Sequence, residues 1–249
     1  MHIRHIFIMI NLLSKKLAPT GILRVAINMS NFLLVSGTDS SGLPEGVSPD
    51  LGRRVAKELK IPYKLVKYKS PGELADAVNK NQWDIGNIAF EPKRAETIDF
   101  TNSYVNIDAN FLVRKIDNFK TNEEIKRSKA KIAVFERSAY DLWLTDNFKD
   151  IELIRTDSIQ SSHTLFNEGK VNILAGLKSK LIEESSENNK LKIIEDPFTF
   201  IKQSVGIKKG NPDVIRFLNN LISNLIKEGF IEQLLRKYKV ENKLSIPRL

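Results

Sequence analysis

The sequence predicts an α/β fold built from parallel βαβ units, and three observations support this prediction. Short apolar segments alternate with capped, amphipathic helical segments along most of the chain. Hydrophobic residues make up 41% and charged residues 28% of the 249 residues, a composition typical of a globular protein. A chain of this length buries about three quarters of its unfolded surface, which is enough for one large or two small domains.

Each expected strand is a short run of apolar or β-branched residues bounded by turn or helix signals. The expected strands are residues 23–27, 63–67, 85–88, 110–113, 131–135, 152–155, 171–174, 192–195 and 204–207. Helical segments fall between most of these runs, which favours parallel sheets. Near the end of the chain, a long helix is expected to begin at Pro212 and to end before Gly229.

Helix signals are clearest in residues 46–104. Ser48 is expected to cap a first amphipathic helix, and Ser70 with Glu73 forms a capping box for a second. Pro92 is expected to open a third helix, which places Arg94 beside free backbone N–H groups. A helix start beside a fork-shaped guanidinium is a good receiver for a small anion such as a carboxylate.

The charge and residue composition narrow the function classes. The formal net charge is +9, but the lysines are scattered and no nucleic-acid motif is present, which favours a solvated basic surface over nucleic-acid binding. Because the chain has no cysteine, disulfides, thiolate metal sites and cysteine nucleophiles are excluded. The three histidines are His2, His5 and His163, and none lies in a metal-ligand spacing, so we expect no metal and no cofactor.

Residues 1–20 are expected to be a leader or a disordered segment. Residues 6–13 are an apolar run interrupted by Asn11, but Ser14-Lys15-Lys16 follows where a signal peptide would have a small-x-small cleavage site. The signal peptide is therefore weak. No apolar run reaches the length of a membrane span.

Several motifs occur in an order that resembles one known family. They are residues 23–27, residues 46–59, Trp83-Asp84-Ile85, the Arg94, Asp99-Phe100 and Tyr104 series, residues 131–134 before a Ser-capped helix, residues 169–172, and the closing helical tail. Together they cover about residues 23–238, and they resemble the bacterial extracellular solute-binding proteins of family 3, the receptors of polar amino-acid ABC transporters. Residues 31–34, 138–142 and 175–178 look like a distinct branch of that family.

The resemblance implies a two-lobe, periplasmic-binding-protein-like clamshell of type II, with a ligand cleft between the lobes. Residues 21–107 and 200–249 would form a discontinuous first lobe, and residues 108–199 the second. The implied protein is a periplasmic, monomeric receptor that captures a small carboxylated solute for an ABC permease without covalent chemistry. A cytosolic ligand sensor and a cyclohexadienyl-dehydratase-like enzyme, with Glu91 as proton donor, stay open as alternatives.

In the first lobe, Arg94 stands where the family carries the arginine that grips the ligand carboxylate. The alternative is a surface arginine paired with Glu91 or Glu96. The remaining site candidates of this lobe are Asn28 in place of an acidic residue, Asn31 at the position of an aromatic clamp, Phe32 and Phe90 as stacking rings, and Ala89 and Glu91 in a turn that lacks the family's Ser/Thr pair.

In the second lobe, Ser138, Ala139 and Tyr140 stand at the helix start that offers hydroxyl and N–H groups to the carboxylate. Leu177 stands where the amino-acid receptors have the aspartate that pairs with the α-ammonium, and Lys178 adds positive charge. A buried, unpaired ammonium is costly. We therefore expect a solute without an α-amino group, or one whose ammonium is held elsewhere, for example by Glu91 or Asp141.

Overall fold

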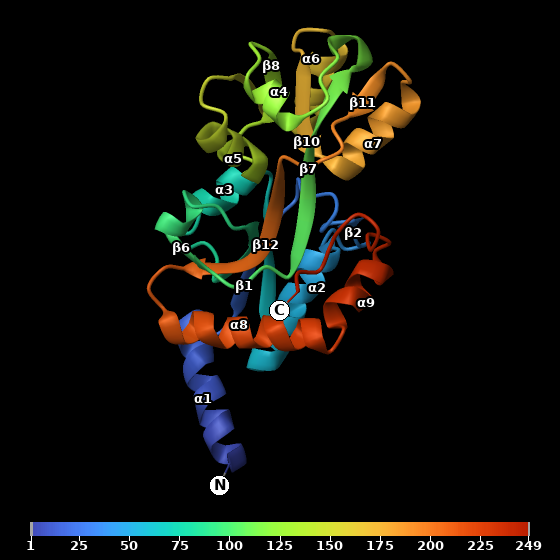
Figure 1. Ribbon diagram of the computed structural model, residues 1–249. Coiled ribbons are helices and arrows are strands. Elements are labelled where there is room, and N and C mark those ends of the chain that lie inside the picture. Colours follow the sequence, from blue (N-terminus) through green and yellow to red (C-terminus); the bar gives the residue numbers. More distant parts are fainter. Residues whose placement is uncertain (1, 249) are drawn as a thin grey trace. The chain divides into compact units, whose positions relative to one another are not determined.

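The computed structural model describes residues 2–248, with side chains from residue 10 onward, and the chain forms two compact units (Figure 1). Unit 1 consists of the chain up to Val105 and from Lys202 onward, and unit 2 is the segment Asn106–Ile201. Each unit contains a sheet with helices packed against it. Unit 1 is therefore assembled from segments that are far apart in the sequence.

Three parallel strands form one side of the sheet in unit 1. Strand β1 (Leu23–Asn28) lies between β4 (Tyr63–Tyr68) and β5 (Ile85–Ala89). Strand β12 (Thr199–Lys208) pairs antiparallel with β5, and β6 (Ile98–Phe100) pairs antiparallel with β12. A small separate hairpin consists of β2 (Gly37–Thr38) and β3 (Pro44–Glu45).

The helices of unit 1 bury one apolar face each. They are α1 (His2–Leu17), α2 (Val47–Leu59), α3 (Pro71–Asp76), α8 (Pro212–Lys227) and α9 (Phe230–Lys237). Helix α2 approaches β1 closely because Gly52 has no side chain: a Cβ atom there would lie 2.5 Å from Cγ1 of Val25. On the other side, Leu74, Trp83 and Ile88 belong to a buried cluster that joins α3 to the sheet.

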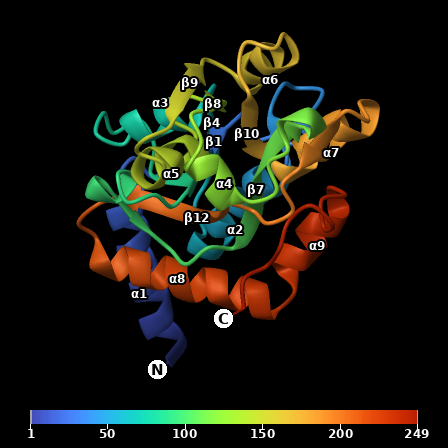
Figure 2. The same ribbon diagram turned by 45° about the horizontal axis from the view of Figure 1, so that its top comes forward.

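Residues that the sequence analysis set apart as a leader or disordered segment form α1, and the second half of this helix packs on unit 1. Figures 1 and 2 both show α1 beside α8, and α1 also contacts α2. Leu13 and Leu17 are buried, and the Ser14 hydroxyl donates to the carbonyl oxygen of Leu59 at 3.1 Å. Within the described residues, no helix is both long and apolar enough to cross a membrane.

The sheet of unit 2 has the strand order β7-β10-β8-β9. Strands β8 (Lys131–Phe135), β9 (Glu152–Thr156) and β10 (Ile173–Leu177) are parallel, whereas β7 (Val105–Arg114) runs antiparallel to β10. The last strand, β11 (Leu191–Ile193), pairs antiparallel with β7. The helices are α4 (Asn122–Lys126), α5 (Ala139–Asn147), α6 (Ile159–Asn167) and α7 (Lys178–Glu187). A short 3-10 helix, η2 (Lys115–Asp117), follows β7.

Three local predictions need correction. Pro92 does not open an α-helix, because the segment forms only the 3-10 helix η1 (Arg94–Glu96). Ser48 is not the N-cap of α2. That position is Gly46, where a Cβ atom would lie 2.4 Å from the carbonyl oxygen of Leu34. Strand β10 continues to Leu177 instead of ending at residue 174, because β7 pairs with it along that length. The Ser70 cap is confirmed, since its hydroxyl accepts from the Glu73 N–H at 3.2 Å.

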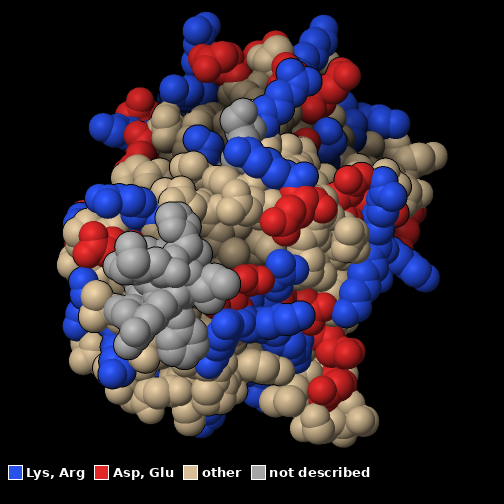
Figure 3. Space-filling view, turned by 90° about the horizontal axis from the view of Figure 1, so that it is seen from below, with Lys and Arg blue, Asp and Glu red and all other residues tan. Residues whose placement is uncertain are grey.

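Basic side chains are dispersed in the folded chain as they are in the sequence. On the face shown in Figure 3, lysine and arginine side chains are interspersed with aspartate, glutamate and uncharged residues. Several arginines of the helices form ion pairs within their own helix, such as Arg54 with Glu58 and Arg236 with Glu232. These exposed pairs contribute little to stability, typically below about 1 kcal/mol each.

Candidate functional site

Two of the parallel strands in unit 1 end at the same edge of the sheet, and the predicted site residues of this unit lie at their ends or in the segments that follow them. Asn28 is the last residue of β1 and Ala89 is the last residue of β5. The strands are direct neighbours, with Ile27 opposite Asn87. Ligands of open α/β sheets bind at the carboxyl ends of parallel strands. The loops after β1 and β5 are therefore the candidate binding surface of this unit.

Arg94 is buried at the start of η1, with 5% of its surface exposed. Its Nη1 donates to the carbonyl oxygen of Ala89 at 2.9 Å, which ties the guanidinium to the end of β5. This burial contradicts the alternative of a surface arginine, and the exposed partner of Glu96 is Lys93, at 2.9 Å. A buried guanidinium is costly unless it is paired and hydrogen bonded, and the carbonyl oxygen of Ala89 supplies one such bond.

Asn28 and Asn31 shape the loop that follows β1. The Asn28 side-chain oxygen accepts from the N–H of Ser30 at 3.2 Å and from its hydroxyl at 2.8 Å. Asn31 is buried, and its side-chain oxygen accepts from the N–H of Leu34 at 3.3 Å. Short polar side chains of this kind stabilise turns by bonding nearby backbone. The structure thus gives both asparagines a loop-forming role at the candidate edge.

Phe32 and Phe90 are the exposed aromatic residues of this edge. Their exposed fractions are 37% and 41%, which are large for apolar side chains. The Phe90 ring is held in an edge-to-face contact with Phe100, with the ring centroids 5.4 Å apart. Glu91, the next residue, is buried. An exposed ring supported from behind is suited to stacking on a ligand.

A layer of buried polar groups in unit 1 was missed by the sequence analysis. The hydroxyl groups of Ser48 and Tyr104 lie 3.2 Å apart, and the Asn87 amide donates to the carbonyl oxygen of Ser48 at 3.2 Å. Among the described residues, the side-chain oxygen of Asn87 has no hydrogen-bond partner. Burial raises the pKa of the Tyr104 phenol, so it stays neutral. This layer fixes the start of α2 against β5.

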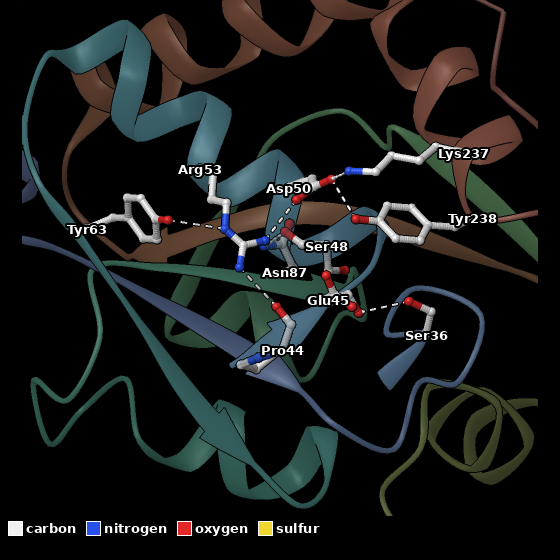
Figure 4. A network of polar contacts seen from close by, with 10 residues as sticks. All are labelled: Ser36, Pro44, Glu45, Ser48, Asp50, Arg53, Tyr63, Asn87, Lys237 and Tyr238. Atoms are coloured by element: carbon white, nitrogen blue, oxygen red, sulfur yellow. Dashed lines mark hydrogen bonds and ion pairs between the residues drawn. The ribbon is translucent and has the colours of Figure 1, made fainter. Parts of the chain in front are cut away.

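Asp50 anchors the first turn of α2 to the C-terminal helix α9 (Figure 4). Its carboxylate accepts from Arg53 at 2.8 Å, from Lys237 at 2.7 Å and from the Tyr238 hydroxyl at 2.6 Å. Burial is the largest single influence and raises the pKa of Asp50. The hydrogen bonds from Lys237, Tyr238 and Arg53 and the charge of Lys237 together outweigh it, so the pKa lies below its ordinary value. The network holds the start of α2 against the end of α9.

In unit 2, three neighbouring strands have one end at the sheet edge where the parallel strands finish. Strands β8 and β10 are parallel and end there, and the antiparallel strand β7 begins there. Ser138 follows β8, Leu177 ends β10, and Asp108 lies near the start of β7. The predicted site residues of unit 2 are therefore brought to one edge, together with Asp108, which the sequence analysis missed.

Ser138 is confirmed as the N-cap of α5. Its hydroxyl accepts from the N–H of Asp141 at 3.1 Å, and the residue is buried. Ala139 and Tyr140 begin the helix and are buried too. Burial raises the pKa of the Tyr140 phenol, although a hydrogen bond with Ser138 opposes the increase. Tyr140 therefore packs within unit 2 as a neutral side chain.

Asp141 already holds a cation of its own unit. Its carboxylate accepts from Nε of Arg155 at 3.0 Å and from the N–H of Arg137 at 2.7 Å. Only 2% of Asp141 is exposed, so its carboxylate stabilises the start of α5 from within the fold. Releasing Arg155 to bind an ammonium would leave a charge without its partner, which is costly for a partly buried group.

The end of β10 combines an apolar residue with an ion pair. Leu177 is 8% exposed and lies opposite Ala109 of β7. Lys178 begins α7, and its Nζ lies 3.3 Å from Oδ2 of Asp108. Because Asp108 comes from β7, far from Lys178 in the sequence, no local pattern could have revealed this pair.

One cavity in unit 1 lies away from the predicted site residues. It has a volume of about 460 Å³, and Arg24, Asp84 and Lys208 are among the residues that line it. Its three cationic side chains already have partners: Arg24 pairs with Asp84 at 2.6 Å, Lys16 pairs with Asp213 at 3.2 Å, and Lys208 donates to the side-chain oxygen of Asn81 at 2.9 Å. Among the side chains of residues 10–248, no cluster of three or more His, Cys, Asp or Glu could hold a metal ion.

Comparisons with known proteins support the family resemblance. The sequence model of the bacterial extracellular solute-binding proteins, family 3, matches residues 23–241. The L-cystine-binding protein TcyJ of Escherichia coli (strain K12) is 23% identical over 197 residues, covering 78% of this chain and 73% of that protein. The ABC transporter glutamine-binding protein GlnH of Bacillus subtilis (strain 168) is 20% identical over 207 residues, covering 82% of this chain and 76% of that protein.

A solved structure shows the same fold. The crystal structure of a cysteine-binding protein from Campylobacter jejuni superimposes with a TM-score of 0.73 and 21% sequence identity, covering 92% of each chain. This match confirms the predicted two-lobe α/β fold. Since the family model spans most of the sequence, from β1 to the residues after α9, the chain belongs to the bacterial extracellular solute-binding proteins of family 3.

Proposed function

We propose that this solute-binding protein captures a small organic solute through a carboxylate, and that Arg94 receives that carboxylate. The observation that carries the proposal is the burial of Arg94 at the carboxyl ends of β1 and β5, with Nη1 fixed on Ala89. A guanidinium has five N–H donors in a planar fork, so it can bind a carboxylate with two parallel bonds. The amino-acid-binding relatives support a carboxylated solute.

Unit 2 would contribute the start of α5. The backbone N–H groups of the first helical turn lack partners within the helix, and the helix dipole is positive there. The Ser138 hydroxyl satisfies one of these groups, that of Asp141. We propose that the remaining polarity of this turn, at Ala139 and Tyr140, assists in binding the anionic end of the solute.

Arg94 can be tested by titration calorimetry against a panel of carboxylates and amino acids. Arg94→Ala is expected to weaken binding by about 2–5 kcal/mol, or roughly 30- to 4,000-fold. Arg94→Lys is expected to weaken it as well, because an ammonium cannot form the bidentate pair. The matched control is Arg216→Ala, which removes an exposed arginine on α8 of the same unit. Unchanged affinity in a folded Arg94→Ala variant would remove Arg94 from the site.

We further propose that the protein is a periplasmic monomer that delivers its solute to an ABC permease. The relative named as an ABC transporter glutamine-binding protein supports this assignment. Osmotic-shock fractions of the native host are expected to contain the protein, and its gene is expected beside permease and ATPase genes. Recovery only with cytoplasmic proteins would favour the cytosolic sensor alternative.

Release of the solute without chemical change is also part of the proposal. The rival enzyme needs a proton donor, and Glu91 is the candidate because it is buried beside the exposed ring of Phe90. After long incubation with the protein, the bound solute is expected to be recovered intact by mass spectrometry. Turnover that disappears in Glu91→Gln would establish the dehydratase-like alternative instead.

A further inference from the structure

The ion pair between Asp108 and Lys178 is the charged feature of unit 2 that the proposed function leaves unexplained. Asp108 lies near the start of β7 and Lys178 follows the end of β10, and the two charged atoms are 3.3 Å apart. The side chains are 31% and 41% exposed. The pair thus lies at the sheet edge that Ser138 and Leu177 also reach, and solvent can contact both groups.

Helix stability gives no reason for a lysine at this position. Lys178 is the first residue of α7, where the helix dipole favours acidic side chains, and the first turn of α7 contains no acidic residue. Leu177 precedes the helix and provides no side-chain cap. A half-exposed pair also contributes little to folding. The charge of Lys178 therefore interacts unfavourably with the dipole of α7, so helix stability does not explain its presence there.

The pair controls which charge a ligand would meet at this edge. Asp108 alone would attract an ammonium group, because a carboxylate at a partly desolvated edge interacts more strongly than in water. With Lys178 in place, the local charge is balanced, and an incoming ammonium must displace Lys178 to reach Asp108. A neutral or anionic group meets no such competitor.

We propose that Lys178 masks Asp108, and that this pair makes the receptor select solutes whose group at the β10 end is neutral or anionic rather than an ammonium. Asp108 could then bind an ammonium group only if Lys178 were displaced, and Lys178 thereby determines which class of solute binds. This inference rests on the proposed capture of a carboxylated solute, and it adds the class of solute: a carboxylic acid without a free α-amino group.

The test uses matched pairs of probes in titration calorimetry on the full chain. The pairs are L-glutamate with glutarate, L-histidine with imidazolepropionate, and L-cystine with dithiodipropionate. The native protein is expected to prefer the acid that lacks the amino group. Lys178→Met keeps the aliphatic stem but removes the charge, and it is expected to shift the affinity ratio toward the amino acid by about tenfold. Adding Asp108→Asn to this variant is expected to reverse the shift.

The matched control is Lys180→Met, which removes another lysine of the first turn of α7, one that pairs with Glu183 at 2.8 Å. This variant is expected to leave the ratio as in the native protein. An unchanged ratio in Lys178→Met, an equal shift in Lys180→Met, or a shift that survives Asp108→Asn would each overturn the proposed selectivity.

Two further outcomes separate this inference from the proposed function. A native protein that binds the amino acids and not the deaminated acids would overturn the selectivity while leaving a carboxylate receptor in place. If neither the native protein nor Lys178→Met binds any probe, both the carboxylate receptor and the selectivity are rejected. Circular dichroism melting of each variant confirms that the fold is intact, which is expected because both lysines are partly exposed.

Discussion

Replacing Asp50 by asparagine is expected to destabilise unit 1 substantially. The carboxylate accepts hydrogen bonds from Arg53, Lys237 and Tyr238 at 2.6–2.8 Å, and its side chain is only 16% exposed. Hydrogen bonds to a charged group contribute about 1.5–3 kcal/mol each when buried. Since Arg53 and Lys237 are partly exposed, their shares are reduced, and the expected loss for Asp50→Asn is about 2–3 kcal/mol.

The assay is urea unfolding followed by circular dichroism, with Asp213→Asn as the matched control. Asp213 pairs with Lys16 at 3.2 Å, but its side chain is 57% exposed, so its replacement is expected to cost less than about 0.5 kcal/mol. A loss below about 0.5 kcal/mol for Asp50→Asn as well would show that the network of Figure 4 does not hold α2 to α9.

The same comparison predicts a pH dependence with a definite sign. The folded-state pKa of Asp50 is lowered, so its contribution to stability is fully present above the unfolded-state pKa of about 3.9. The contribution is lost as the pH falls through the folded-state pKa. The stability difference between the native protein and Asp50→Asn should therefore shrink on acidification below about pH 4. A difference that stays constant down to pH 2 would contradict the assignment.

Two further predictions concern the edge of unit 2. Ser138→Ala is expected to cost about 0.5–2 kcal/mol of stability and to weaken solute binding. Thr121→Ala removes the equivalent cap of α4, so it should reduce stability by a similar amount but leave the affinity measured by calorimetry unchanged. If both variants bind the solute with equal affinity, Ser138 only caps α5 and does not take part in binding. Leu177→Asp is expected to raise the affinity for an amino acid relative to its deaminated analogue by roughly 3- to 30-fold. A ratio that stays unchanged while the protein remains folded would show that position 177 does not face the solute.

Much of the fold was predictable because its signals are local. The strand with Val25 and the strand with Ile132 are short apolar runs between turn signals, and the cap at Ser138 is a serine followed three residues later by an acid. Such patterns depend on side chains a few residues apart, which a sequence displays directly. Each predicted strand accordingly has an observed counterpart, and so do the capped helices that begin after Ser70 and Ser138. The expectation of purely parallel sheets was wrong, because β7, β11 and β12 run antiparallel to their neighbours.

The errors arose where distant segments decide the local structure. Gly46, and not Ser48, is the N-cap of α2, and the backbone of Leu34 lies too close to that position for any side chain. The buried contact of Ser48 with Tyr104, and the pair of Lys178 with Asp108, each join residues from different parts of the chain. A single sequence contains no signal for such contacts, so the polar layer and the ion pair could only be found in the folded chain.

The charges at the edge of unit 2 bear directly on the class of solute. Asp108 holds Lys178 and Asp141 holds Arg155, so each of these two carboxylates would have to give up a cation before it could bind an ammonium. Giving up a cation costs more at Asp141, which is almost fully buried, than at Asp108, which is partly exposed. If an amino acid does bind, its ammonium should therefore compete for Asp108 first. The Asp108→Asn single variant would then lose affinity for that amino acid, while its affinity for the deaminated acid would be unchanged.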